Sequence, residues 1–141
     1  MLLAINFYNI IQCDAVVGCG VNAETFSSFL RRLVAVFGEG DFTIVMDNVR
    51  FHHTTVNNMD HFPYDVKFIP RYSPFLNPCE EAFSMLKNRV RRDGVPQITN
   101  DLVRRITDSC VEIPMNSLLN FVAHAETFSN KCLNLEDISR D

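Results

Sequence analysis

The stretch FTIVMDN at residues 42–48 decides the fold, because an almost continuously apolar run ends there in an acid. Such a run is typical of a β-strand that is covered on both faces, and it predicts a strand over 42–47. Working outward, Asn22 is a good cap for a helix over about 23–37, whose apolar residues recur at helical spacing. DVKFI at 65–69 predicts a further strand. Strands and helices therefore mix within one short segment.

The rest of the chain continues this mixture. The other predicted elements are strands over 2–11 and 13–17, a short helix within 50–62, helices over about 78–92, 99–113 and 116–133 (the last capped by Asn116), and a polar tail over 135–141. Strands layered with helices predict an α/β domain. A length of 141 residues fits one domain, residues 1–141, with a real core.

Composition excludes several classes of protein. The chain is 47% hydrophobic and 21% charged, which is ordinary for a globular domain. Its net charge of −4 gives no global signature of a nucleic-acid binder, so any DNA contact must come from a local patch. The five cysteines are odd in number and form no CxxC motif, as expected in a reducing compartment. No stretch is apolar for long enough to span a membrane, and we expect a soluble, intracellular protein without a small-molecule cofactor.

Two acids mark the candidate site. Asp47 ends the strand over 42–47, and Glu80 falls in the first turn of the helix over 78–92, after the loop PRYSPFLNP at 70–78. The prolines of this loop stiffen it by fixing φ. Carboxylates at the ends of two rigid elements suit Mg²⁺, which proteins hold through one or two carboxylates plus the phosphates of the substrate. The pattern therefore predicts a phosphoryl-transfer site.

A helical wheel of 78–92 separates the two adjacent glutamates. At about 100° per residue, Glu80 shares a strip at the edge of the core with Lys87 and Arg91, which predicts phosphate-binding cations beside the acid. Glu81 is expected to point toward solvent, near Arg92.

Less specific interpretations remain open for each of these residues. Asn77 as helix cap with Glu80 three residues later is also a capping-box arrangement, and spacing alone slightly favours capping over catalysis. Asp47 could merely start a turn. The basic residues of the helix could be a solvated face. A zinc site that combines Cys79 with histidines is a further alternative, and its candidate ligands are His52, His53 and His61.

The ordered set VMDNVRFH at 45–52 and FIPRYSPFLNPCEEAFSMLKNRV at 68–90 resembles the DDE catalytic domain of mariner-type transposases. That family has an aspartate-asparagine pair followed by a histidine, then a PPYSP.LNPxE loop and a helix ending in LK..V. Here Arg71 replaces the second proline of the loop, and Phe75 stands where the family often has an acid. The resemblance covers about residues 5–92 and is vague over 93–141, which looks like a helical C-terminal part.

The resemblance implies a ribonuclease-H-like mixed sheet flanked by helices. It assigns Asp47 as the second catalytic acid and Glu80 as the third, both as ligands of Mg²⁺ or Mn²⁺. The implied reaction is DNA strand cleavage and transfer. It also implies supporting roles for three polar residues, Asn48, His52 and Asn77. The basic residues expected to contact DNA are Arg71, Lys87 and Arg91. DNA at transposon ends is the implied partner, with a homo-oligomer or an intact transposase as further partners and a nuclear or nucleoid location.

One departure from the family limits this interpretation. The first aspartate of the family lies on the central first strand, upstream of the two strands that begin at Met1 here. Asp14 is the only acid before the helix over 23–37 that could replace it, and it falls in the wrong strand. We therefore expect a domain truncated at its N-terminal end, with weakened metal binding. Alternatives are a catalytically dead module that binds nucleic acid or a transposase, and a small-molecule metal hydrolase, which would leave the basic strip unexplained.

Overall fold

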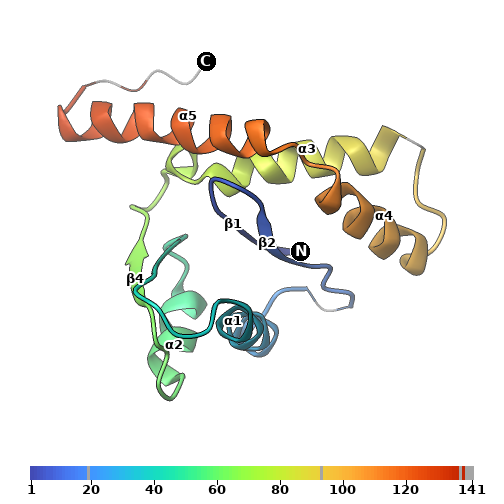
Figure 1. The fold of residues 1–141 in the computed structure, drawn as a ribbon, viewed down its shortest axis with the longest axis horizontal. Helices are drawn as coiled ribbons and strands as arrows, with labels where there is room; N and C mark the ends of the chain where they lie inside the picture. Colours follow the sequence, from blue (N-terminus) through green and yellow to red (C-terminus); the bar gives the residue numbers. More distant parts are fainter. Residues whose placement is uncertain (19, 93, 137, 139–141) are drawn as a thin grey trace.

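The computed structural model describes residues 1–18, 20–92, 94–136 and 138. Within them the chain forms a mixed α/β arrangement of two small sheets and five α-helices (Figure 1). The elements in chain order are β1 (Leu2–Ile5), β2 (Ile10–Asp14), α1 (Ala23–Phe37), β3 (Thr43–Met46), α2 (Arg50–Asn58), β4 (Asp65–Phe68), the 3₁₀ turn η1 (Pro74–Leu76), α3 (Pro78–Arg92), α4 (Thr99–Val111) and α5 (Met115–Leu133). The predicted polar tail lies mostly outside the described residues, as does Cys19.

The N-terminal hairpin differs from the prediction. β1 and β2 pair antiparallel, but the turn falls at Asn6–Asn9 and not near residue 12, so the expected strands over 2–11 and 13–17 were wrong in their bounds. The Asn6 side chain is the physical reason. Its Oδ1 accepts hydrogen bonds from the backbone N–H groups of Tyr8 and Asn9, at 2.8 and 2.9 Å. This local turn competes with continued strand pairing.

The caps of α1 confirm the prediction for this helix. Asn22 Oδ1 accepts from the Thr25 N–H at 2.9 Å, and Thr25 Oγ1 accepts from the Asn22 N–H at the same distance. At the other end Gly38 adopts φ +68°, where a side chain would be strained, and stops the helix.

The buried face of α1 joins both sheets into one cluster. Its buried residues are Phe26, Phe29, Leu30 and Leu33. Leu2 and Ala4 of β1 pack against this cluster, and so do residues of β3 and β4 such as Met46 and Phe68. One helix therefore covers one face of both sheets.

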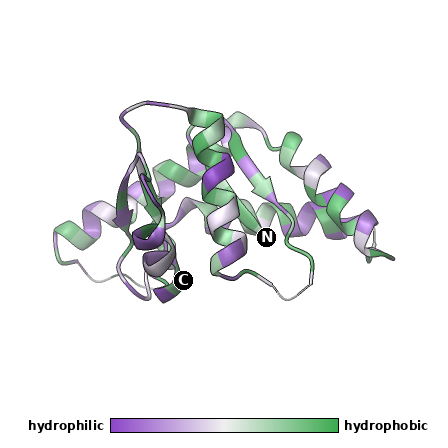
Figure 2. Ribbon diagram, turned by 90° about the horizontal axis from the view of Figure 1, so that it is seen from below, coloured by the Kyte–Doolittle hydropathy of each residue, from purple (hydrophilic) through white to green (hydrophobic). Residues whose placement is uncertain are grey.

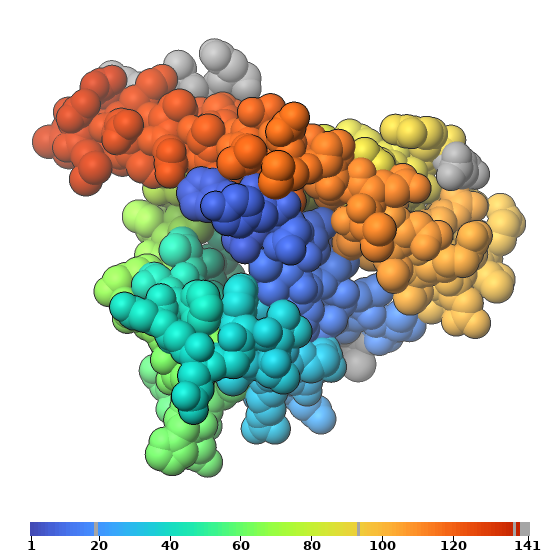
Figure 3. Space-filling model, viewed as in Figure 1, coloured from blue at the N-terminus to red at the C-terminus, as the bar shows by residue number. Residues whose placement is uncertain are grey.

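The three C-terminal helices cover the opposite face of the β1–β2 hairpin. Leu86 of α3 and Leu118 of α5 form a second buried cluster with Ile113, and Leu3 and Ile5 of β1 pack against it. In Figure 3 the blue hairpin lies between the orange-red C-terminal helices and the turquoise segment that follows α1. Hydrophobic and hydrophilic positions alternate around the helices in Figure 2, as expected for helices that pack on one face.

The β3–β4 pair is covered on one face only. The two strands are parallel, with Thr43 opposite Asp65 and Met46 opposite Phe68. Met46 points into the core, whereas Val45 is 61% exposed on the other face. The prediction of a strand buried on both faces was wrong, because the C-terminal helices pack on the hairpin instead.

The strands form two separate sheets in the described part of the chain. β1 pairs with β2 alone, and β3 with β4 alone. β1 and β3 therefore each keep one edge without a strand partner among the described residues, although α1 packs against both.

The last two helices follow the predicted bounds closely, with one error at a cap. Pro114, and not Asn116, is the N-cap of α5, and its carbonyl accepts from the Ser117 N–H at 3.0 Å. Asn116 lies inside the first turn. None of the helices in the described ranges combines the length and the apolar character that crossing a membrane requires.

Candidate functional site

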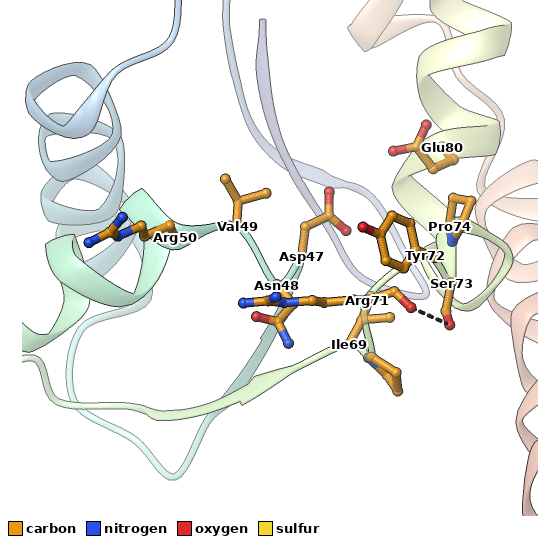
Figure 4. Close-up of a pocket in the computed structure, with 11 residues that line it drawn as sticks. Asp47, Asn48, Val49, Arg50, Ile69, Arg71, Tyr72, Ser73, Pro74 and Glu80 are labelled. Atoms are coloured by element: carbon orange, nitrogen blue, oxygen red, sulfur yellow. Dashed lines mark hydrogen bonds between the residues drawn. The ribbon is translucent and has the colours of Figure 1, made fainter.

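Asp47 and Glu80 line the same surface pocket, which has a volume of about 500 Å³ (Figure 4). Asp47 follows the end of β3, and Glu80 lies in the first turn of α3. The complete lining is Asp47, Asn48, Val49, Arg50, Ile69, Pro70, Arg71, Tyr72, Ser73, Pro74 and Glu80. The pocket thus lies where the ends of β3 and β4 meet the proline-rich loop and the start of α3.

Asn77 connects the two acid-bearing elements. Its Nδ2 donates a 2.7 Å hydrogen bond to Asp47 Oδ1, and its Oδ1 accepts one from the Cys79 backbone N–H at 3.0 Å. One side chain therefore caps α3 and at the same time holds the carboxylate at the end of β3. A hydrogen bond to an ionised carboxylate is among the stronger ones in proteins.

Glu80 does not form the capping box that the sequence allowed. The Asn77 N–H donates to the Pro74 carbonyl at 2.9 Å, so the group that a capping glutamate would bind is already used. Asn77 caps through Cys79 instead. The exposed side chain of Glu80 is left to face the pocket.

Glu81 does not point to solvent near Arg92 as expected. Its Oε2 lies 3.1 Å from His124 Nδ1 on α5, and the residue is half-buried. The expectation failed because the wheel of α3 alone does not show that α5 packs along that side. This pairing strengthens the choice of Glu80 as the acid of the pocket, since the Glu81 carboxylate already binds His124 of α5.

The two histidines of the VRFHH segment hold the end of β3. His52 Nδ1 donates to the Asp47 carbonyl at 3.0 Å, and His53 Nε2 donates to Asn48 Oδ1 at 2.7 Å. The His52 ring also stacks on Phe26 of α1, with centroids 4.2 Å apart. Burial lowers the pKa of His52 despite the opposing effects of the Asp47 carbonyl and charge.

The charges of both acids act on the thiol of Cys79. Burial raises the pKa of its thiol to about 12, and the negative charges of Asp47 and Glu80 add to the shift. Without a metal the thiol is therefore neutral at neutral pH and a poor nucleophile. With the neighbouring histidines engaged as described, the zinc alternative has no support, and the described residues contain no group of three or more His, Cys, Asp or Glu side chains placed to hold a metal ion.

The predicted basic residues separate into two places. Arg71 lines the acid pocket together with Arg50. Lys87 and Arg91 instead line a different, mainly apolar groove that also includes Leu102 and other residues of α4. The strip seen on the helical wheel therefore leads away from the pocket.

Asp14 is not placed to complete the acid pair. It ends β2 and forms an ion pair with Arg32 of α1, and it does not line the pocket of Asp47 and Glu80.

Two pocket residues with a cationic or an aromatic side chain were not singled out from the sequence. Arg50 opens α2, and Tyr72 lies in the loop with a positive φ of 62°. Their proximity to the acids depends on how the loop folds, although Tyr72 stood within the quoted loop motif and could have been named from it.

The fold and the pocket define a class: a mixed α/β domain with two carboxylates and two arginines at one end of a parallel strand pair. The model of the DDE superfamily endonuclease family matches residues 1–101, which include β1 to α3 and the beginning of α4. The chain therefore belongs to the DDE superfamily endonuclease family. No curated protein matches it significantly.

Proposed function

We propose that this chain is the C-terminal part of the catalytic domain of a mariner-type DDE transposase. Its ancestral reaction is the Mg²⁺-dependent cleavage and transfer of DNA strands. Residues 1–141 form one partial domain, and Asp47 and Glu80 are the second and third catalytic acids. The observation that carries the proposal is that these two acids, from two elements far apart in sequence, line one pocket.

The donor set in the pocket fits a hard divalent cation. Asn77 occupies one oxygen of Asp47 and leaves Oδ2 without a hydrogen-bond partner among the described residues, and Glu80 is exposed at the pocket. Asp47 and Glu80 would hold Mg²⁺ or Mn²⁺, with substrate phosphate oxygens as further ligands. When bound, such a metal activates an attacking oxygen and stabilises a leaving one. Asp47 and Glu80 are two acids of the family set, so residues 1–141 alone are expected to bind the metal weakly.

The residues around the acids have supporting roles in this proposal. Asn77 orients the Asp47 carboxylate, and His52 holds the backbone at the same residue through its carbonyl. Asn48 is held in turn by His53.

Three basic residues bind DNA in this proposal. Arg71 binds a phosphate beside the acids, which its place in the pocket supports. Lys87 and Arg91 bind more distant phosphates, along the exposed side of α3.

A ribonuclease-H-like sheet requires a strand between the two pairs that the chain forms. β1 and β3 each have one edge without a partner in the described residues, and α1 packs against both. A strand that pairs with both edges would join them into one mixed sheet. In the family this strand carries the first aspartate, so we propose that a strand outside the described residues completes the sheet.

The partners and location follow from the reaction. The chain binds the DNA of transposon ends, associates with itself or with an intact transposase that supplies the central strand, and resides in the nucleus or nucleoid. A non-catalytic module that only binds DNA or a transposase is the second candidate. The edges of β1 and β3 that lack a strand partner among the described residues favour it for the chain acting alone, because they could bind a strand of a transposase.

The test of the acid assignment uses the chain extended by the aspartate-bearing first strand. This extended chain is expected to cut its cognate DNA with Mg²⁺ or Mn²⁺. Glu80→Gln abolishes cleavage, whereas the matched variant Glu81→Gln is tolerated, because Glu81 pairs with His124 and not with the pocket. Equal losses from both changes would contradict the choice of Glu80.

Residues 1–141 alone are expected to be inactive and prone to aggregation. Each buried backbone group that lacks a partner costs about 1–3 kcal/mol, and a whole domain has only about 5–15 kcal/mol of stability. Size-exclusion chromatography, thermal melting and a Mg²⁺-dependent cleavage assay test this. A monomer that melts cooperatively and cuts DNA would overturn it.

A further inference from the structure

Tyr72 has an unusual backbone conformation. Its φ of +62° lies in the left-handed region, which is strained for a residue with a side chain. The loop fixes it there, because Pro70 lies two residues before it and the following turn is closed by two backbone hydrogen bonds, from Leu76 N to Ser73 O and from Asn77 N to Pro74 O. Strain of this kind persists where a function needs the side chain in one direction.

Packing does not explain the strain. The Tyr72 side chain is 88% exposed, and its hydroxyl makes no hydrogen bond within the described residues. Tyr64 shows the contrast, because it is 6% exposed and its hydroxyl donates to the Gly38 carbonyl at 2.6 Å. The ring of Tyr72 therefore adds little to the stability of the fold.

The exposed ring stands beside the acids. Tyr72 lines the pocket of Asp47 and Glu80, and in the view of Figure 4 its ring lies between their side chains. Arg71, the preceding residue, lines the same pocket, as does Arg50. An aromatic face, cationic groups and two carboxylates thus share one small surface.

We propose that Tyr72 stacks on an unpaired base next to the phosphate that the acids address, while Arg71 binds a backbone phosphate of the same strand. This inference rests on the proposed function. Aromatic side chains stack on any base, and cationic side chains beside them bind the strand without reading its sequence. The site therefore selects frayed or single-stranded ends over fully paired DNA, because an unpaired base needs no unstacking.

The composition of the chain offers a clean probe. It contains no tryptophan, so Tyr72→Trp creates a single fluorophore at the pocket. Tyr8→Trp is the matched control, because Tyr8 is also exposed, at 69%, but lies in the β1–β2 turn and outside the pocket. Both variants of the 141-residue chain are titrated, at low protein concentration and without metal, with a blunt duplex and with the same duplex carrying an unpaired 3′ overhang. Anisotropy of a dye on the DNA reports binding independently.

The overhang DNA is expected to quench the tryptophan at position 72 and to leave the one at position 8 unchanged. Tyr72→Phe retains the affinity for overhang DNA, whereas Tyr72→Gly weakens it by about 5- to 150-fold, the range that stacking of one base supplies. Binding of the blunt duplex changes by less than about twofold. Because glycine suits a positive φ, Tyr72→Gly is also expected to melt no lower than the parent chain, which separates a loss of stacking from a loss of folding.

Two outcomes overturn the inference in distinguishable ways. If anisotropy shows binding but position 72 is not quenched, or Tyr72→Gly binds as the parent does, Tyr72 is not the stacking residue and the proposed function stands. If the chain binds neither DNA, the inference and the DNA-binding part of the proposed function fail together.

Discussion

Replacing Asn77 tests whether one side chain joins the two halves of the pocket. Asn77→Ala removes the cap on Cys79 N, a loss of about 1 kcal/mol, and the hydrogen bond to the Asp47 carboxylate, a loss of about 1.5–3 kcal/mol. Both groups are half-buried, so the upper ends of these ranges are not expected to add fully. We expect the free energy of unfolding to fall by about 2–4 kcal/mol.

Asn77→Asp separates the two contributions. The new carboxylate still accepts the hydrogen bond from Cys79 N. At neutral pH it has no N–H group to donate to Asp47, so two negative charges face each other. Two unit charges 4 Å apart repel by about 4 kcal/mol at an effective dielectric constant of about 20. This repulsion favours a state in which the two carboxyl groups share one proton, which removes much of the cost. The variant is therefore expected to regain stability relative to the parent as pH falls from 7 toward 5.

The assay is urea unfolding followed by circular dichroism, with freshly isolated monomer, at both pH values. Asn22→Ala is the matched control, because Asn22 caps α1 without touching the pocket, and it is expected to cost only about 1 kcal/mol at either pH. Added Mg²⁺ is expected to stabilise Asn77→Asp more than the parent, since the pocket then holds three carboxylates. Equal losses for Asn77→Ala and Asn22→Ala, with no pH effect in Asn77→Asp, would refute the bridge.

Two further predictions concern His52 in α2 and Val45 in β3. Burial lowers the pKa of His52 below its ordinary value of 6.5, so the folded state binds fewer protons than the unfolded one. The contribution of His52 to stability is full above pH 6.5 and is lost as pH falls from this value through the lower pKa of the folded state. His52→Asn is expected to flatten the acid limb of a pH–stability curve. The control is His61→Asn, at an exposed residue with a positive φ that asparagine tolerates, and it is expected to leave the shape of the curve unchanged. The same slope in both variants would contradict the assignment of the acid limb to His52. Val45→Lys, on the exposed face of β3, is expected to reduce the self-association measured by light scattering. The control Val36→Lys on α1, where the residue has a similar exposure of 63%, is expected to have little effect. Equal effects of the two variants would mean that β3 does not mediate the association.

Local signals allowed the sequence to predict much of the fold. The Asn22 cap and the proline-stiffened loop before α3 are local signals, and the predicted starts of α1 and α3 follow from them. The apolar run before Asp47 likewise predicted β3 and its acid at the pocket.

The errors arose where long-range packing decides. Val45 is exposed because α3 to α5 cover the hairpin, and Glu81 pairs with His124 because α5 lies beside α3. Neither packing arrangement can be predicted from hydrophobic periodicity, which describes one helix or strand at a time. The bond from Asn77 to Asp47 spans 30 positions and could not be predicted from the LNPCE motif alone.

The central claim, that Asp47 and Glu80 hold one divalent metal, is tested most directly by iron-mediated cleavage of the protein itself. Fe²⁺ replaces Mg²⁺ in oxygen-ligand sites, and with ascorbate and peroxide it releases radicals that cut the backbone close to the bound ion. We expect fragments that end near Asp47 and near Glu80, suppressed by excess Mg²⁺ and by Glu80→Gln but not by Glu81→Gln. Cleavage confined to other segments, such as that around Asp14, or unchanged in Glu80→Gln, would contradict the claim.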